Sequence, residues 1–349
     1  MSKIRLGVIG CGGMEGSHQN GLNELKDKLV VTCTCDLIEE RAKKAAEVLG
    51  AGHYFTDYKD MVDLVDAVLI VLPNNLHFEV GIFFIRRNKH VLMEKPLCIN
   101  EYECKTLMDA AKEHNVTLMT AYPVRYWPAV RKLKELVDSG EYGELYHMSI
   151  WTEQYTCNYN TPWVHTVKGV GGGQFFGHGC HYVDIMLWFL GNPVWGTHVG
   201  TRFGTPWMEA EGTSDVCIKF ESGAIGYHMG TWGARGTHHG YDFQLHMTKG
   251  MLEYDHGQKK IFLYRNTNSD LPSDDGHEKV EVIWEADDNS KQTQFEIGHF
   301  VDCIMNHKIP ETNAEGSLQG LRVIWKLYEA EKNGTVADLR GLGLAQYKG

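Results

Sequence analysis

One lysine, Lys95, lies between a predicted buried strand and a proline, a position that could hold its side chain toward a ligand. The apolar run Val91–Met93 leads into Glu94, Lys95 and Pro96. Pro96 cannot donate a ladder hydrogen bond and biases the preceding residue toward extended geometry, so the backbone at Lys95 is constrained. The carboxyl edge of a doubly wound sheet is where such sheets bind ligands. The alternative is a surface Glu–Lys pair that ends a strand.

A glycine-rich turn follows the first predicted strand, residues 4–9. Gly10, Gly12 and Gly13 precede a helix that we expect to run to about residue 26. Glycines let the backbone approach a pyrophosphate closely, and a helix N-terminus offers N–H groups to phosphates. In the pattern G-x-G-x-x-G the third glycine would fall at Glu15, and Gly16 comes one place late. The turn predicts a dinucleotide site with an altered third position.

The next predicted strand, residues 29–35, ends at an acidic residue, Asp36. A carboxylate at this point of a dinucleotide site accepts hydrogen bonds from the ribose 2′-OH and repels a 2′-phosphate. We therefore predict NAD as the cofactor, with NADP less favoured. The alternative is that Asp36 caps the amphipathic helix that follows and runs to Leu49.

These residues need a scaffold of strands that alternate with helices. Up to residue 122 that alternation predicts an N-terminal doubly wound parallel sheet, a Rossmann domain over residues 1–122. Residues 123–349 are rich in strands of alternating polarity, which predicts a C-terminal α+β domain with a large open, mainly antiparallel sheet. In the first domain we expect further strands at 53–55, 67–72, 91–95 and 116–121. In the second we expect strands at 145–153, 197–203, 211–220, 224–233, 241–248, 250–255, 260–264 and 280–284, with helices at about 128–139, 179–190, 294–306 and 317–333.

Composition narrows the class of protein. Lys and Arg total 34 and Asp and Glu total 45, so the net charge is 34 − 45 = −11, and no long basic cluster predicts a nucleic-acid partner. No apolar run reaches the roughly 20 residues of a membrane helix, and the N-terminus lacks the pattern of a secretory signal. We expect a cytoplasmic protein whose nine scattered cysteines are reduced thiols.

Five motifs follow one another along the whole chain. They are the glycine turn, Asp36, Pro73-Asn74-x-x-His77, Glu94-Lys95-Pro96, and the triplet Gly171-Gly172-Gly173 ahead of His181-x-x-Asp184. In this order the motifs resemble the Gfo/Idh/MocA family of glucose–fructose oxidoreductase, inositol dehydrogenase and their relatives. The resemblance implies a nicotinamide cofactor and a sugar or polyol substrate.

The resemblance also assigns catalytic residues. Lys95 matches the catalytic lysine, which hydrogen-bonds the reacting hydroxyl or stabilises an oxyanion. Family members follow the glycine triplet with an Asp and, four places on, a His, and here those positions hold Gly177 and His181. His178 stands beside the missing carboxylate, in a His-Gly pair that resembles a branch of the family that cleaves glycosides with NAD. We therefore expect Lys95, His181 and His178 to be catalytic, with His181 ranked above His178.

Two further sets of residues are expected at the site, and no metal. The residue types of His178, His181 and Asp184 would suit zinc, but nicotinamide chemistry does not need a metal, and we expect none. The predicted cofactor-binding residues are Gly10, Gly12, Gly13, Met14, Asp36, Arg41, Pro73, Asn74, His77, Glu94 and Lys95. The predicted substrate-binding residues are Lys95, Arg125, Tyr155, Tyr159, Trp163, His165, His178, His181 and His238.

Three functions remain open from the sequence. The leading one is an NAD-dependent oxidoreductase that acts on a secondary hydroxyl of a sugar, glycoside or inositol-like polyol. The second is an NAD-dependent glycosidase or lyase-like enzyme with no net redox change, favoured by Gly177 and His178. The third is a non-catalytic NAD-binding regulator, favoured by Glu15. We expect a homodimer or homotetramer formed through the C-terminal sheet.

Overall fold

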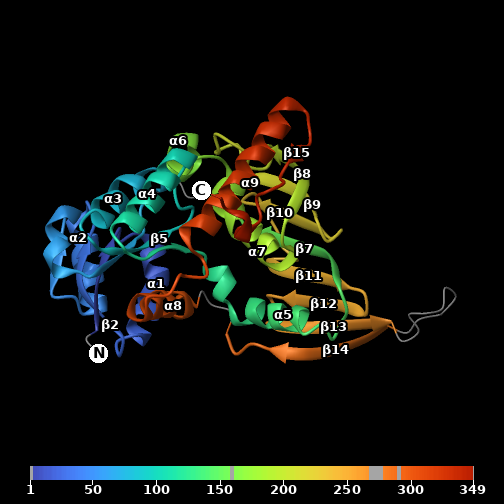
Figure 1. The fold of residues 1–349 in the computed structure, drawn as a ribbon, viewed down its shortest axis with the longest axis horizontal. Coiled ribbons are helices and arrows are strands. Elements are labelled where there is room, and N and C mark those ends of the chain that lie inside the picture. The colour runs from blue at the N-terminus through green and yellow to red at the C-terminus, as the bar shows by residue number, and fades with distance from the viewer. Residues whose placement is uncertain (1–2, 158–160, 267–277, 289–291, 349) are drawn as a thin grey trace. The chain divides into compact units, whose positions relative to one another are not determined.

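The computed structural model of this protein describes residues 3–157, 161–266, 278–288 and 292–348. The chain forms two compact units, which Figure 1 colours along the sequence. The first unit contains the chain up to Tyr126, the short segment Lys168–Gly171 and a C-terminal segment that ends at Leu318. The second unit contains the remainder.

The first unit is built on a parallel sheet, which confirms the predicted Rossmann architecture. Its described strands follow the order β3-β2-β1-β4-β5-β6, so the order reverses between β1 and β4. Ligands of doubly wound folds bind outside the carboxyl ends of the strands at such a reversal. The strands are β1 (Ile4–Ile9), β2 (Leu29–Cys35), β3 (His53–Phe55), β4 (Ala67–Ile70), β5 (His90–Glu94) and β6 (Leu118–Ala121).

Helices cover both faces of this sheet. In Figure 1, α1 and α8 lie together on one side of the sheet, and α3 and α4 lie together on the other. Residues 58–64 form a 3-10 helix rather than an α-helix. The helices are α1 (Gly13–Glu24), α2 (Glu39–Leu49), η1 (Tyr58–Leu64), η2 (Asn74–Leu76), α3 (His77–Ile85), α4 (Glu101–Glu113), η3 (Pro123–Tyr126) and α8 (Thr293–Asn306).

Helix α8 belongs to the first unit although it comes late in the chain. The sequence division placed it in the region 123–349, whereas the structure packs it against α1. Its buried residues Ile297, Phe300 and Val301 join the core formed by the strands. Glycine makes the close approach possible, because a Cβ atom at Gly21 would lie 2.5 Å from Thr293 Oγ1. The hydrophobic pattern of the sequence does not indicate that a late helix packs against the first unit.

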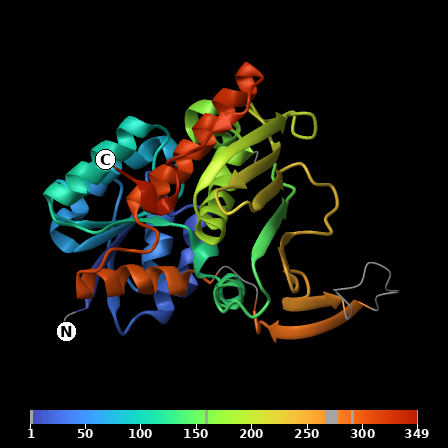
Figure 2. The same cartoon turned by 45° about the vertical axis from the view of Figure 1, so that its right-hand side comes forward.

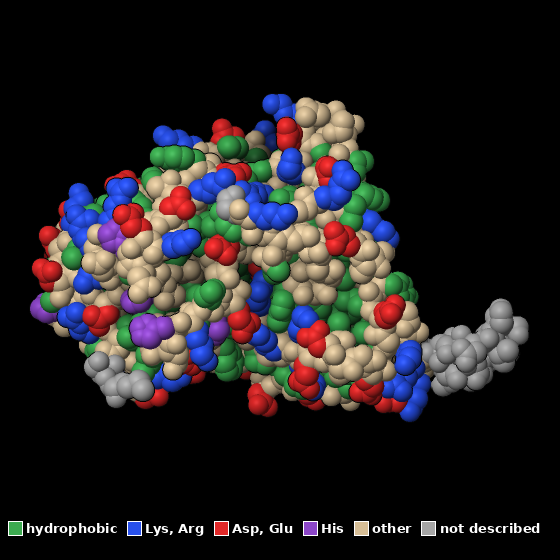
Figure 3. All heavy atoms as spheres, in the orientation of Figure 1, with side chains coloured by type: hydrophobic (Ala, Val, Ile, Leu, Met, Phe, Trp, Pro, Cys, Tyr) green, Lys and Arg blue, Asp and Glu red, His purple; other side chains and the backbone are tan. Residues whose placement is uncertain are grey.

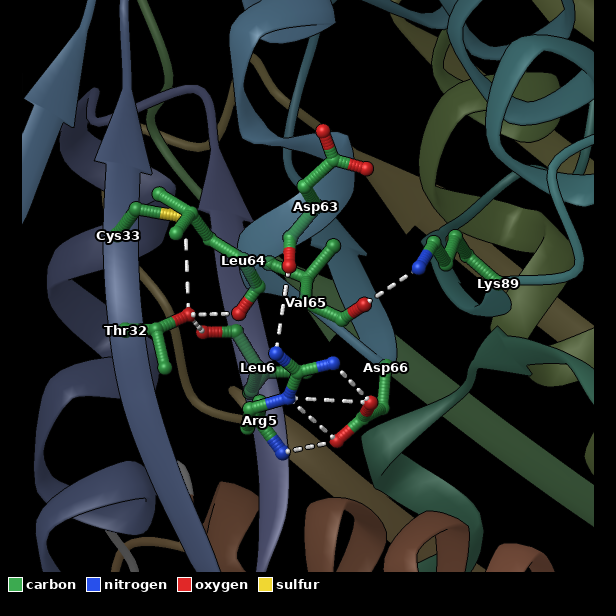
Figure 4. A network of polar contacts seen from close by, with 9 residues as sticks. All are labelled: Arg5, Leu6, Thr32, Cys33, Asp63, Leu64, Val65, Asp66 and Lys89. Carbon is green, nitrogen blue, oxygen red and sulfur yellow. Dashed lines mark hydrogen bonds and ion pairs between the residues drawn. The ribbon is translucent and has the colours of Figure 1, made fainter.

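The amino edge of the sheet is held by polar contacts that Figure 4 shows from close by. The Arg5 guanidinium lies 2.7 Å from Asp66 Oδ1, and Lys89 Nζ donates to the Val65 carbonyl at 2.8 Å. Thr32 Oγ1 donates to the Leu64 carbonyl at 3.0 Å. These contacts fix the segment that enters β4. The glycine turn and Lys95 lie at the opposite edge of the sheet, where the strands have their carboxyl ends.

The second unit is built on a mixed sheet, mainly antiparallel as predicted, with the described strand order β14-β13-β12-β11-β7-β10-β9-β8-β15. Only the β7–β10 pair among these strands is parallel. The strands are β7 (Leu145–Glu153), β8 (Pro193–Thr201), β9 (Thr213–Phe220), β10 (Ile225–Thr231), β11 (Tyr241–Met247), β12 (Gly250–Asp255), β13 (Lys260–Asn266), β14 (Glu278–Glu285) and β15 (Ala337–Asp338).

One face of this sheet is packed and the other is open. Alternate residues such as Met148 and Ile150 are fully buried beneath helices, and Figure 2 shows α7 along this face. The opposite face exposes Trp195 and Val199 of β8. The helices and short helical turns of this unit are α5 (Pro128–Asp138), η4 (Pro162–His165), a π-helical turn η5 (Phe175–Gly179), α7 (Cys180–Leu190), α9 (Ala314–Asn333), whose residues up to Leu318 belong to the first unit, and η6 (Leu344–Gln346). Helix α6 (Val167–Val170) belongs to the first unit from Lys168 onward.

The surface gives no sign of a single-sign patch on the side visible in Figure 3, where basic and acidic side chains are interspersed. Among the described helices none is both long and apolar enough to cross a membrane. The nine cysteines are free thiols.

Candidate active site

The glycine turn after β1 has the geometry that a dinucleotide requires. Gly10 has a φ of 89°, and a Cβ atom there would lie 2.1 Å from the Val71 carbonyl oxygen, so only glycine fits. Gly12 and Gly13 face open space, because an added Cβ at either would meet nothing within 4 Å. Helix α1 begins at Gly13. The turn therefore leaves backbone and helix N-terminus open to a pyrophosphate.

Asp36 anchors the glycine turn to the end of β2. Its Oδ2 accepts a hydrogen bond from the Cys11 backbone N–H at 2.8 Å, and its Oδ1 accepts one from Ile38 N at 2.8 Å. Helix α2 begins at Glu39 without a side-chain cap, so Asp36 is not its N-cap. Each carboxylate oxygen can accept a second hydrogen bond. The predicted contact with ribose hydroxyls is compatible with this arrangement and stays a prediction.

Glu15 occupies the position that glycine holds in G-x-G-x-x-G. Its side chain is 2% exposed, and Oε2 accepts a hydrogen bond from Gln19 Nε2 at 3.0 Å. Its Oε1 has no hydrogen-bond partner among the described residues. Burial raises the pKa of Glu15, and Gln19 and His18 only partly oppose this shift. The altered third position therefore places a buried carboxyl group under the turn.

A buried polar contact connects helix α1, which follows the glycine turn, to β5, which leads to Lys95. His18 of α1 is fully buried, and its Nε2 lies 2.8 Å from Glu94 Oε1 at the end of β5. The other carboxylate oxygen of Glu94 accepts a hydrogen bond from the Lys95 backbone N–H at 3.1 Å. Glu94 thus fixes the main chain at Lys95, whose peptide bond to Pro96 is cis.

His77 is a second brace beside Lys95. Its Nδ1 lies 2.8 Å from the Pro96 carbonyl oxygen and its Nε2 lies 2.9 Å from the Leu72 carbonyl oxygen. Burial lowers the pKa of His77 although both carbonyl groups favour the charged ring. Asn74 is 5% exposed, and its Nδ2 donates to the Val170 carbonyl at 2.9 Å. The side chains of His77 and Asn74 therefore bind backbone carbonyl groups, at Pro96 and Leu72 for His77 and at Val170 for Asn74.

The other predicted cofactor residues differ in exposure. Met14 is partly buried against the core beside the turn, Pro73 is half-buried at the end of β4, and Arg41 is exposed on α2. All of them lie in the first unit, as does Lys95.

The predicted catalytic histidines lie together in the second unit. His178 is in the π-helical turn and His181 follows in the first turn of α7, with ring centroids 5.7 Å apart at 80°. The His178 ring also contacts Tyr182 at 5.4 Å and Tyr241 at 6.0 Å. His181 is 4% exposed and His178 is half-buried. The histidine pair therefore lies against two tyrosines.

A carboxylate and a tyrosine clamp the start of this segment. Glu211 Oε1 accepts hydrogen bonds from Tyr328 OH at 2.6 Å and from Phe175 N at 3.1 Å. Tyr328 OH in turn accepts from Phe176 N at 3.1 Å. Gly173 is required because a Cβ there would lie 2.2 Å from the Glu211 carbonyl oxygen. The clamp satisfies N–H groups that a helix start leaves unpaired.

Sequence reasoning missed several residues of this unit. Gln154 donates to Tyr241 OH, and burial raises the pKa of Tyr241 to about 12. His228 stacks on Tyr182 with centroids 4.8 Å apart, and burial lowers the pKa of His228 to about 3. These residues come from separate strands and carry no local motif, so only the strand pairing brings them together.

The remaining predicted substrate residues are dispersed. Arg125 lies in the first unit, is 4% exposed and donates to the Glu311 carbonyl at 3.2 Å. In the second unit, Tyr155 is 59% exposed and stacks edge-on against Trp207, and the His238 backbone N–H donates to Glu153. Trp163 and His165 are half-buried in η4, and Asp184 is 3% exposed in α7. Tyr159 lies outside the described residues.

The described residues do not bring together the donors that a metal site needs. Within the part of the chain that the structure describes, no group of three or more His, Cys, Asp and Glu side chains could hold a metal ion.

Comparison with known families identifies the class of protein. Residues 4–122 match the model described as oxidoreductase family, NAD-binding Rossmann fold, and residues 130–253 match the GFO/IDH/MocA C-terminal domain. The chain is therefore a member of the Gfo/Idh/MocA oxidoreductase family, as the motifs predicted.

Individual relatives are similar over most of the chain. The scyllo-inositol 2-dehydrogenase (NAD(+)) of Bacillus subtilis is 27% identical over 88% of this chain and 88% of its own. The D-xylose 1-dehydrogenase (NADP(+)) 2 of Haloferax volcanii is 26% identical over 86% of this chain and 89% of its own. A levoglucosan dehydrogenase structure in complex with NADH and levoglucosan has a TM-score of 0.85 at 20% identity, covering 97% of this chain and all of the other.

We predict that Tyr328→Phe destabilises the protein by about 1–3 kcal/mol, because it leaves Phe176 N without its acceptor and removes one of the two donors to Glu211 Oε1. Urea unfolding followed by circular dichroism measures the change. The matched control is Tyr146→Phe, since Tyr146 is 51% exposed and its free energy of unfolding should change by less than about 0.5 kcal/mol. Equal stability of the two variants would show that the clamp contributes nothing.

Proposed function

We propose that this protein is an NAD-dependent oxidoreductase that transfers a hydride between nicotinamide and a secondary hydroxyl of a sugar, glycoside or inositol-like polyol. The observation that carries the proposal is the position of Lys95 at the carboxyl end of β5, braced by Glu94 and His77. The open glycine turn lies at the same edge of the same sheet. Relatives named as inositol and sugar dehydrogenases support the choice of substrate class.

The bound cofactor would supply the hydride acceptor. The residues that fit it are Gly12 and Gly13 at the pyrophosphate and Asp36 at the ribose. Lys95 presents an ammonium or amine group that hydrogen-bonds the reacting hydroxyl and stabilises negative charge as the hydroxyl proton leaves. His181 is the second group proposed to carry that proton, because imidazole changes charge near neutral pH.

A second candidate function is glycoside cleavage without net redox change. It is favoured by Gly177, which removes the usual carboxylate, and by His178 beside it. Oxidation of a ring hydroxyl to a ketone acidifies the neighbouring C–H. A base that removes this proton would let the glycosidic substituent leave, and returning the hydride would restore NAD.

Both functions are tested by a screen of sugars, inositols and aryl glycosides in which NADH absorbance and released aglycone are followed together. We expect NADH to accumulate with at least one substrate. Aglycone release with catalytic NAD and no accumulated NADH would instead establish the second function.

Lys95→Met should lower turnover by at least about 10²-fold while leaving NAD affinity unchanged, because the side chain acts at the substrate rather than at the cofactor. Stopped-flow absorbance gives kcat and calorimetry gives the affinity. Lys44→Met is the matched control, since Lys44 is exposed on α2. A Lys95→Met enzyme with near wild-type kcat would remove Lys95 from the mechanism.

Cofactor choice gives a separate prediction. NAD should bind at least about tenfold more tightly than NADP, because a 2′-phosphate beside Asp36 costs about 1.4 kcal/mol or more. Asp36→Ala should narrow this ratio and weaken NAD binding, whereas Glu40→Ala on the exposed face of α2 should change neither. Calorimetry with both cofactors measures the ratio. Equal affinities in the wild-type protein would contradict the role given to Asp36.

We also propose that the open face of the C-terminal sheet joins two copies of the chain in a homodimer or a homotetramer. Apolar side chains are exposed near both edges of this sheet, and exposed apolar surface is common where copies of a chain associate. They include Trp195 and Val199 of β8 and Val280 and Val282 of β14. Val199→Asp should shift sedimentation velocity toward a smaller species, and Val48→Asp on α2 should not. A wild-type protein that sediments as a monomer at micromolar concentration would contradict the proposal.

A further inference from the structure

A fully buried glutamine side chain links the second sheet to His178. Gln174 is 0% exposed and precedes His178 by four residues, on the same side of the helical turn. Ser214 Oγ donates a hydrogen bond to Gln174 Oε1 at 3.1 Å. On its other side, Gln174 Nε2 lies 3.4 Å from His178 Nδ1. The amide therefore bridges a strand and a predicted catalytic ring.

The sheet makes room for this amide at one glycine. Gly230 of β10 pairs with Ser214 of β9, and the Gln174 side chain lies over this pair. A Cβ atom at Gly230 would lie 2.5 Å from Gln174 Nε2 and 2.8 Å from Oε1. Any side chain at this position would displace the amide, and it would also press on the His228 ring, whose Cε1 would lie 2.8 Å from the added Cβ atom. The glycine thus allows the amide to lie in its bridging position.

The hydrogen bond from Ser214 decides which way the amide faces. Ser214 is fully buried, and its hydroxyl proton has an acceptor only while Gln174 Oε1 points toward it. Reversing the amide would leave that proton without an acceptor, which is unfavourable in a buried site. With Oε1 turned to Ser214, the NH₂ group faces His178. Nδ1 of the ring must then accept.

We propose that Gln174 is a positioning residue that holds His178 neutral, with its proton on Nε2. A ring whose Nδ1 accepts from an amide presents an N–H donor at Nε2, and taking up a second proton would set two donors against each other. This role rests on the proposed function, and it leaves proton removal to Lys95 and His181.

The proposal also separates the two candidate functions. Glycoside cleavage needs a base that removes a proton from carbon, and His178 was the residue that favoured it. A ring held with Nδ1 occupied and Nε2 protonated has no lone pair to offer as that base. The arrangement of Gln174 therefore favours net oxidation.

The direct test is the tautomer of His178, read from ¹⁵N chemical shifts of histidine-labelled protein without cofactor or substrate. The spectra are recorded above the ordinary imidazole pKa, and the His178 signals are assigned by their loss in His178→Asn. We expect the Nε2–H tautomer alone in the wild-type protein. Gln174→Glu should reverse it to Nδ1–H, because a carboxylate accepts, and Gln174→Met should give a mixture of both.

A second variant acts on the amide without touching either partner. Gly230→Ala should displace Gln174 and shift the His178 signals toward those of Gln174→Met. Gly236→Ala is the matched control, since a Cβ atom there meets nothing within 4 Å, and it should leave the signals unchanged. Ser214→Ala, which removes the hydroxyl that orients the amide, should also give a tautomer mixture.

Kinetics supply an independent reading. Gln174→Glu should lower kcat for sugar oxidation about tenfold, with NAD affinity unchanged. Failure of the screen to find any oxidised substrate would end the proposed function but leave the tautomer result standing. An Nδ1–H tautomer or a charged ring in the wild-type protein would overturn the proposal. So would His178 signals that do not respond to Gln174→Met and Gly230→Ala.

Discussion

The parallel pairing of β1 with β2 and β4, and of β4 with β5, is the constraint on which the first unit depends. Because these strands run in one direction, the residues that follow them reach the same edge of the sheet. Gly10, Asp36 and Lys95 are brought to that edge from distant points in the sequence. The buried contact between His18 and Glu94 then couples the helix after Gly10 to the main chain at Lys95. The glycine turn and the strand that leads to Lys95 are thus parts of one compact unit.

The second unit holds His178 and His181 in a different way from the first unit's hold on Lys95. Its mixed sheet supplies buried polar groups rather than a common strand edge. Glu211 fixes the start of the helical segment, and Gln174 fixes one ring nitrogen of His178. Buried hydrogen-bonded networks of this kind are stabilising only when every member is satisfied. The pairing of β9 with β10 therefore positions the Gln174 amide that faces His178 Nδ1.

The sequence predicted the parallel sheet well because β4 and β5 are continuous apolar runs bounded by polar turns, and the glycine and Asp36 spacing is local. It predicted the histidine segment because the glycine triplet and His181 keep a familiar order. It did not reveal that α8 returns to the first unit, because the apolar stripe of a helix does not indicate which element the helix packs against. The roles of Glu211, Tyr328 and Gln174 were equally hidden, since they depend on pairing between strands far apart in the chain. Glu15 was noticed as a departure, but its burial required the structure.

Transfer of deuterium from substrate to cofactor shows whether the substrate C–H bond is broken as a hydride at the sheet edge that carries Lys95. The measurement uses a sugar or inositol substrate deuterated at the reacting carbon, with NAD and the intact protein, and mass spectrometry of the nicotinamide. We expect deuterium in the reduced cofactor and a slower rate with the deuterated substrate, and we expect both to be lost in Lys95→Met. Product formation with no deuterium in the cofactor and no isotope effect would contradict it.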